Sequence, residues 1–246
     1  MTDIQTKNDV ELDDPYLLEG FPGVGLVGKI AVDHVVEKFG MDEYAACDCE
    51  GLPDVAVFDE GKSGIKAPVR ILVDEETDLL ALQSEAPVSP QKTACFADCF
   101  TKWLGEIDAT PVYLSGLPSK KEEGESPDMY GVSVAGMEER LRELGIQPPS
   151  QNGVVSGPTG SLLNKARKTE TDAAGLIVES DPQFPDPGAS RVLIEEGISP
   201  ITGVDIDTQE LVEHAEEIME KKKQLAEQMS EAGEESTSAA PVGMYQ

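Results

Sequence analysis

The segment PYLLEGFPGVGLVGKIAVDHVVEKF, residues 15–39, has the pattern of a strand, a glycine-rich turn and a helix. Its first part, 15–21, is an apolar run of strand length, and the apolar residues of 26–39 recur at helical spacing. Between these two parts the chain carries several glycines and a proline, which mark a turn. This order of elements is typical of the first unit of an α/β fold.

The same alternation continues along the chain. Further apolar runs of strand length lie at 44–49, 55–58, 69–73, 79–83, 112–115, 154–156 and 176–179. Helical patterns lie near 91–105, 136–144, 158–168 and 188–197. We predict a three-layer α/β sandwich with a mainly parallel or mixed sheet covered on both faces, in which 69–73 and 79–83 form an antiparallel hairpin.

Composition divides the chain into four parts. The polar stretch 1–13 is expected to be a flexible leader, and 14–206 a single α/β domain. Asp207, with Glu210 three residues later, resembles a helix N-cap and capping box, so a C-terminal helix is predicted over 207–230. The small and polar residues of 231–246 predict a flexible tail.

The predicted C-terminal helix carries a coiled-coil-like seam. Its members are Leu211, Ala215, Ile218, Lys222, Leu225 and Met229. Such a seam packs either on the helix's own domain or against a second subunit, and the sequence leaves both alternatives open.

Acidic residues outnumber basic ones along the whole chain: 48 Asp and Glu face 19 Lys and Arg, a net charge of −29. An anionic surface argues against nucleic acid as a partner, because phosphate contacts need a cationic face. It is typical of a halophilic protein, since concentrated salt screens the self-repulsion. With neither a signal-peptide pattern nor a run of roughly 18 apolar residues, we expect no membrane contact and a cytoplasmic protein with reduced thiols.

The glycine-rich turn matches two nucleotide-binding motifs. Gly23, Gly28 and Lys29 fit G-x-x-x-x-G-K, but Ile30 stands where that motif needs a metal-binding hydroxyl. With Gly25, the same glycines also fit G-x-G-x-x-G. One hypothesis is therefore a nucleotide or other anion site in this loop. The favoured alternative is a tight turn that packs a helix closely on the sheet.

A second turn, SGPTGS at 156–161, has a similar composition, with Pro158 suited to the first position of a helix. The two turns would either bracket a crevice for an anion or serve as ordinary connections of an α/β fold.

No catalytic residue, metal site or cofactor is predicted. Cys47 and Cys49 share one side of a strand pattern, and Cys95 and Cys99 share one face of a helical pattern. Their spacing is not that of a structural zinc site, so we expect small buried hydrophobic side chains. The two histidines neighbour no Cys or Ser in a recognisable nucleophile motif.

The sequence ends in Met244, Tyr245 and Gln246, which offer an apolar side chain, a hydroxylated ring and a carboxylate. Such an ending on a flexible tether can enter a pocket of a partner, where a cation pairs with the carboxylate and the ring is buried. We expect these three residues to bind a partner.

Four segments resemble the archaeal proteasome-assembly-chaperone family, and the similarity covers about 14–230. They are LLEGFPGVGLVGKIAVDHVVEKFG (17–40), YLSGLP (113–118), GVVSGPTGSLL (153–163) and GLIVES (175–180). The resemblance implies a fold like that of the purine nucleoside phosphorylases, assembly as a homo-oligomer, and binding to the α-ring of the proteasome core particle.

Some members of that family end in the hydrophobic-Tyr-X motif that proteasome activators insert between adjacent α-subunits. That motif maps onto Met244, Tyr245 and Gln246. Relatives have also been labelled as ATP-grasp-type enzymes, so a nucleotide- or nucleoside-binding enzyme using the loop at 23–29 is the alternative. The acidic composition resembles that of haloarchaeal proteins. The leading hypothesis is a non-enzymatic assembly chaperone or adaptor.

Overall fold

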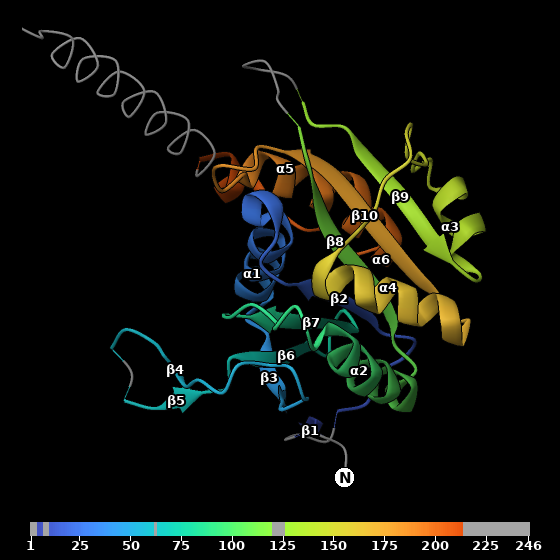
Figure 1. Ribbon diagram of the computed structural model, residues 1–246. Coiled ribbons are helices and arrows are strands. Elements are labelled where there is room, and N and C mark those ends of the chain that lie inside the picture. Colours follow the sequence, from blue (N-terminus) through green and yellow to red (C-terminus); the bar gives the residue numbers. More distant parts are fainter. Residues whose placement is uncertain (1–3, 7–9, 62, 120–125, 214–246) are drawn as a thin grey trace, which may run out of the picture.

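The computed structural model describes residues 4–6, 10–61, 63–119 and 126–213. Its main sheet has eight strands in the order β1-β3-β6-β7-β2-β8-β10-β9, and a separate two-stranded hairpin, β4 and β5, projects beside it (Figure 1). The strands of the main sheet are β1 (Ile4–Thr6), β2 (Tyr16–Gly20), β3 (Asp42–Cys47), β6 (Val69–Asp74), β7 (Leu79–Ser84), β8 (Thr110–Pro118), β9 (Met129–Val134) and β10 (Ala173–Ser180). The hairpin consists of β4 (Val57–Phe58) and β5 (Ile65–Lys66).

The sheet is mixed, as predicted. Strand β2 pairs in parallel with β7 and β8, and β8 pairs in parallel with β10. The other described pairs of the main sheet are antiparallel, including the hairpin of β6 and β7 predicted from the sequence. Strand β2 lies inside the sheet between β7 and β8, and helices cover both faces there. Leu17 and Leu18, on its opposite faces, are therefore both fully buried.

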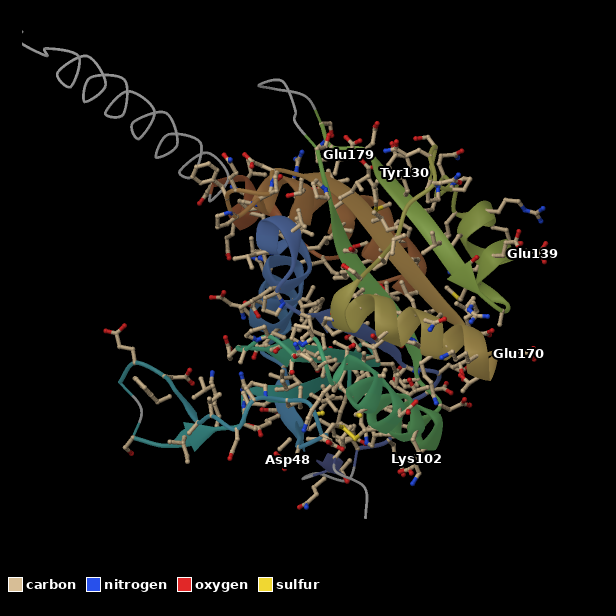
Figure 2. All side chains as sticks on the ribbon, viewed as in Figure 1. Asp48, Lys102, Tyr130, Glu139, Glu170 and Glu179 are labelled. Carbon is tan, nitrogen blue, oxygen red and sulfur yellow. A yellow bond between two sulfur atoms is a disulfide. The ribbon has the colours of Figure 1, made fainter. Side chains whose placement is uncertain are left out.

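Helices cover both faces of the sheet and complete the predicted three layers (Figure 1). One face carries α1 (Val27–Phe39), α3 (Met137–Glu143), α5 (Pro187–Val192), the π-helical turn η2 (Leu193–Ile198) and α6 (Ser199–Thr202), which share one apolar core with Leu18. The other face carries α2 (Thr93–Ile107) and α4 (Gly157–Thr169), which share a second core with Leu17. Charged side chains such as Asp48, Lys102, Glu139 and Glu170 lie at the outside of the molecule (Figure 2).

Three parts of the structure differ from the sequence prediction. The expected leader 1–13 contributes β1, whose Ile4 is only 3% exposed because it pairs opposite Cys47 at the edge of the sheet. The predicted strand 154–156 is an irregular segment that belongs to no described ladder. Strand β9 had no place in the prediction because Gly131 and the residues beside it carry no continuous apolar run.

The start of the C-terminal helix is tied to the end of α1. The Lys38 ammonium contacts Asp207 and Glu210 at 3.2 and 2.8 Å, and the His34 ring donates to the Asp207 carbonyl at 2.7 Å. Asp207 also accepts from the backbone N–H of Gln209, as expected near a helix start. Glu210 pairs with Lys38 instead of completing the predicted capping box. The rest of the predicted helix lies outside the described residues.

The cysteines correct the expectation of reduced thiols. Cys49 and Cys99 form a disulfide between the segment after β3 and helix α2, with Cα atoms 6.0 Å apart. The spacing could not reveal this pair, because the packing of α2 under β3 brings the two cysteines together over 50 residues of sequence. Cys47 is buried as expected, whereas Cys95 is exposed.

No helix in the described part of the chain is both long and apolar enough to cross a lipid bilayer.

The disulfide leads to a stability prediction. Cys99→Ser should lower the free energy of unfolding by about 4 kcal/mol, because it frees a loop of about 50 residues in the unfolded chain. Chemical denaturation without reductant measures the difference, and Cys95→Ser, which removes an exposed thiol, is the matched control. Thiol titration of the denatured wild-type chain should find two reactive cysteines. Four reactive thiols, or equal stability of the two variants, would contradict the prediction.

Candidate ligand pocket at the glycine-rich loop

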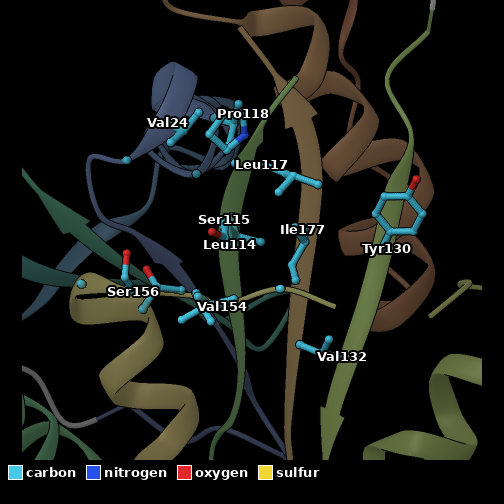
Figure 3. Close-up of a pocket in the computed structure, with 18 of the residues that line it drawn as sticks. Val24, Leu114, Ser115, Leu117, Pro118, Tyr130, Val132, Val154, Ser156 and Ile177 are labelled. Atoms are coloured by element: carbon cyan, nitrogen blue, oxygen red, sulfur yellow. The ribbon is translucent and has the colours of Figure 1, made fainter. Parts of the chain in front are cut away.

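A pocket of about 560 Å³ lies where β2 and β8 end (Figure 3). Its walls come from the turn after β2, the second half of β8, the neighbouring strands β9 and β10, and the segment that leads into α4. In open α/β sheets, ligands bind outside the carboxyl ends of parallel strands. The volume lies within the range of pockets that hold small molecules or side chains.

Two glycines of the loop are required for different structural reasons, a left-handed backbone conformation at Gly25 and close packing at Gly28. Gly25 has a φ of +60°, and a Cβ there would lie 1.9 Å from the Ser180 hydroxyl oxygen. A Cβ at Gly28 would lie 3.1 Å from the Cβ of Leu114, so this glycine brings α1 close to β8. Gly23 has open space around it. Gly25 and Gly28 are therefore explained by backbone conformation and packing.

Lys29 is turned toward acidic side chains. Its ammonium lies 2.9 Å from Asp33 and 3.1 Å from Glu85, and it is not among the residues that line the pocket. Burial lowers the pKa of Lys29, but the hydrogen bonds and charges of Asp33 and Glu85 outweigh burial, so the pKa lies above its ordinary value. Gly23 and Gly28 reach the pocket without the cation that a phosphate loop needs.

The second turn meets the first at this pocket. Ser156 and Thr159, at the start of α4, line it together with Gly23 and Gly28. The two turns therefore bracket one crevice, as one of the sequence alternatives proposed. None of the described lining residues is charged, however, although 27% of all residues in the chain are. An anion in this crevice would have no cationic side chain as a partner.

A buried carboxyl group holds three walls of the pocket together. Glu19, on β2, has no exposed surface and accepts hydrogen bonds from Phe21 N, Thr159 Oγ1 and Leu114 N at 3.1, 3.1 and 3.4 Å. Those three donors line the pocket on the turn, α4 and β8. Burial raises the pKa of Glu19 to about 8, while the three hydrogen bonds act in the opposite direction. The side chain is therefore largely protonated at neutral pH.

Tyr113 lies beside Glu19 on the neighbouring strand. Its hydroxyl group is buried and has no hydrogen-bond partner among the described residues. Burial, and to a smaller extent the charge of Glu19, raise the pKa of Tyr113 above its ordinary value. The sequence analysis missed both residues. The signal for Glu19 was a single carboxylate inside the apolar run LLEGF, at 17–21.

The other predicted site residues cannot be placed. Met244, Tyr245 and Gln246 lie outside the described residues. In the described part of the chain, no group of three or more His, Cys, Asp or Glu side chains could hold a metal ion.

The close approach of the loop to β8 can be tested at Gly116. A Cβ at this position would lie 2.4 Å from the Val24 carbonyl oxygen, which is a backbone atom and cannot rotate away. Gly116→Ala should therefore lower the free energy of unfolding by about 1–3 kcal/mol. Gly23→Ala, in the same pocket but in open space, is the matched control and should change it by less than about 0.5 kcal/mol. Equal effects in thermal or chemical unfolding would argue against this packing.

Glu19 should give the stability a characteristic pH dependence. Its pKa is raised, so between about pH 4.5 and 8 the unfolded chain loses the proton that the folded chain keeps. Stability should fall over this range by about 1.4 kcal/mol per pH unit through Glu19 alone. Glu19→Gln, which cannot ionise, should remove this contribution and be more stable than the wild type at pH 8. Urea denaturation at several pH values measures it, and Glu76→Gln on the exposed β6–β7 turn controls for the loss of one negative charge. An unchanged slope in Glu19→Gln would refute the assignment.

Comparison with known proteins agrees with this fold. An uncharacterized protein of Methanocaldococcus jannaschii is 29% identical over 90% of both chains. The structure of Pyrococcus furiosus PbaA, an archaeal homolog of proteasome-assembly chaperone, has a TM-score of 0.76 at 23% identity and covers 95% of both chains. Pyrococcus furiosus PbaB, an archaeal proteasome activator, has a TM-score of 0.76 at 20% identity, over 92% of this chain and all of PbaB.

These structural likenesses show a shared fold. The PAC2 family model matches residues 17–226, which include the glycine-rich loop, both turns of the pocket and Glu19. The chain belongs to the PAC2 family.

Proposed function

We propose that this protein is a proteasome-binding adaptor or assembly chaperone that engages the α-ring through Met244, Tyr245 and Gln246. The observation that carries the proposal is the hydrophobic-Tyr-X ending on a chain of the PAC2 family. Two proteins with the same fold, PbaA and PbaB, are described as a chaperone homolog and a proteasome activator. In the bound state, Tyr245 would bury its ring, Met244 would add apolar contact, and the Gln246 carboxylate would pair with a cation of the α-subunit.

The charge of the chain favours partner binding by the C-terminal tail over binding by the surface of the folded domain. With a net charge of −29, a rigid face of this chain would repel most acidic partners. The stretch 236–246 contains no Asp, Glu, Lys or Arg, so it can be buried without desolvating a charged side chain. The contacts of Lys38 with Asp207 and Glu210 tie the start of this C-terminal region to the end of α1.

Several tails would act together in a homo-oligomer, which we propose as the functional form. A single tripeptide gives a small contact, and its affinity for one pocket is correspondingly low. Tails that share one body bind successively at a high effective concentration, which raises the overall affinity without any new contact. The rotational symmetry of an α-ring presents several equivalent pockets for such tails.

The alternative, a nucleotide- or nucleoside-binding enzyme using residues 23–29, has less support. Lys29 is held by Asp33 and Glu85, and the pocket beside the loop has no charged lining residue. Phosphoryl transfer depends on cations and metal ions that neutralise the developing charge. The described lining residues include no cationic side chain and no carboxylate that could hold a metal ion.

Removal of the last three residues tests the proposal. A chain lacking 244–246 should fail to co-purify with α-rings in concentrated salt, because the aromatic and carboxylate contacts are gone. Tyr245→Ala should weaken binding by at least about tenfold, which corresponds to about 1.4 kcal/mol. The matched control deletes 236–238, which shortens the tether by the same length but keeps the ending. Binding of the 244–246 deletion at the wild-type level would overturn the model.

A further inference from the structure

One segment beside the pocket has unused hydrogen-bonding capacity. Residues 150–155 lead into α4, and in the described structure their backbone groups form no hydrogen bond with the rest of the chain. Ser156, which follows, has an extended backbone with φ of −115° and ψ of −177°. Residues 150–154 are exposed, whereas Val155 is half-buried and its carbonyl oxygen lies against Gly160. The N–H and C=O groups of 150–154 are therefore available to pair with an added peptide backbone.

The same segment presents an unusual apolar residue. Val154 is 93% exposed, and it also lines the pocket (Figure 3). In Figure 3, the segment that carries it crosses β8, and Leu114 and Ile177 line the same space from β8 and β10. An apolar cavity with unpaired backbone groups at its rim combines the two elements that recognise an extended peptide: a pocket for a side chain and partners for its main chain.

The absence of charged side chains from the described pocket lining indicates which kind of peptide would bind there. Its described lining contains no charged residue, in a chain of which 27% is charged. A charged side chain buried there would have no partner, which is costly. The preferred peptide is therefore uncharged and carries a large apolar or aromatic side chain.

This chain contains such a peptide. Residues 236–246, STSAAPVGMYQ, have no charged side chain and include Met244 and Tyr245. The Gln246 carboxylate is the charged group of this segment, and because the pocket lining offers no cation it would stay in water outside the pocket. We propose that the pocket and its rim at 150–155 bind this terminal segment of the same chain. The body would then hold the tail until a partner competes for it. Binding of the tail to the pocket does not depend on the proposed function. The expected competition between the pocket and α-rings for the tail does rest on the proposed function.

The geometry allows the tail to reach the pocket. Val27 and Gly28, at the start of α1, line the pocket, and Lys38, near its end, holds the base of the C-terminal region. The 13 residues of α1 span about 20 Å. With the predicted helix running to 230, its residues 214–230 span about 26 Å, and the 16 residues of 231–246 reach up to about 53 Å when extended. The extended tail is therefore long enough to return along the predicted helix and to cover the length of α1.

Photo-crosslinking in the full-length chain tests the proposal. With Tyr245→benzoylphenylalanine, irradiation should link position 245 to peptides that contain pocket residues, identified by mass spectrometry. Val154→Asp places a charge on the rim of the uncharged pocket and should lower the yield of these links by about tenfold, equivalent to about 1.4 kcal/mol. Val55→Asp is the matched control, because Val55 is also an exposed valine, at 52%, on the segment before the β4–β5 hairpin. It should leave the yield unchanged.

Four results would overturn the proposal: no crosslink to the pocket, equal yields in the two valine variants, crosslinks found mainly between two chains on a denaturing gel, or a small molecule retained in the pocket that excludes the tail. A separate measurement isolates the proposed function. If the full-length chain does not bind α-rings but still crosslinks to its own pocket, the proposed function fails and the intramolecular binding stands. If both stand, Val154→Asp should bind α-rings at least as tightly as the wild type, because its tail is released.

Discussion

The carboxyl group of Glu19 joins three elements that the sequence places far apart. It receives hydrogen bonds from the turn after β2, from the middle of β8 and from the first turn of α4. Because the group is fully buried, its charged form is disfavoured, and the carboxyl group keeps its proton at neutral pH. The interior therefore holds a neutral group and avoids the cost of burying a charge. The position of α4, the shape of the pocket and the course of the segment before α4 all depend on this junction.

The close approach of backbone segments around this junction explains the glycines. Gly28 lets α1 pack against Leu114, and Gly116 lets β8 pass the Val24 carbonyl. Close packing is therefore enough to explain the glycines of a loop that resembles a nucleotide-binding motif. The residue that distinguishes the two interpretations is Lys29, because its contacts with Asp33 and Glu85 direct the only cation of the motif away from the pocket.

The local elements could be predicted because their signals are local. The strand, turn and helix at 15–39 follow from apolar spacing and glycines, and the hairpin of β6 and β7 follows from two apolar runs joined by an acidic turn. The Cys49–Cys99 disulfide and the pairing of Glu210 with Lys38 depend on contacts between elements, which no spacing within either element records. The pocket was only partly predictable: the sequence indicated two glycine turns, but Glu19, which holds them together, had no partner in the nearby sequence.

Helix α1 connects the pocket with the start of the C-terminal region, the two regions on which the proposed function and the proposed binding of the tail depend. Its first residues line the uncharged pocket, and its last turn holds Asp207 and Glu210 through Lys38. In the proposed arrangement both ends would act on the same C-terminal region: the last turn fixes residues 207–210, and the first residues would offer the tail an uncharged surface. In a chain with 29 excess negative charges, neither the described lining of this pocket nor the stretch 236–246 carries a charged side chain. Burial of each against the other would remove apolar surface from water without desolvating a charged side chain, provided that the Gln246 carboxylate stays in water.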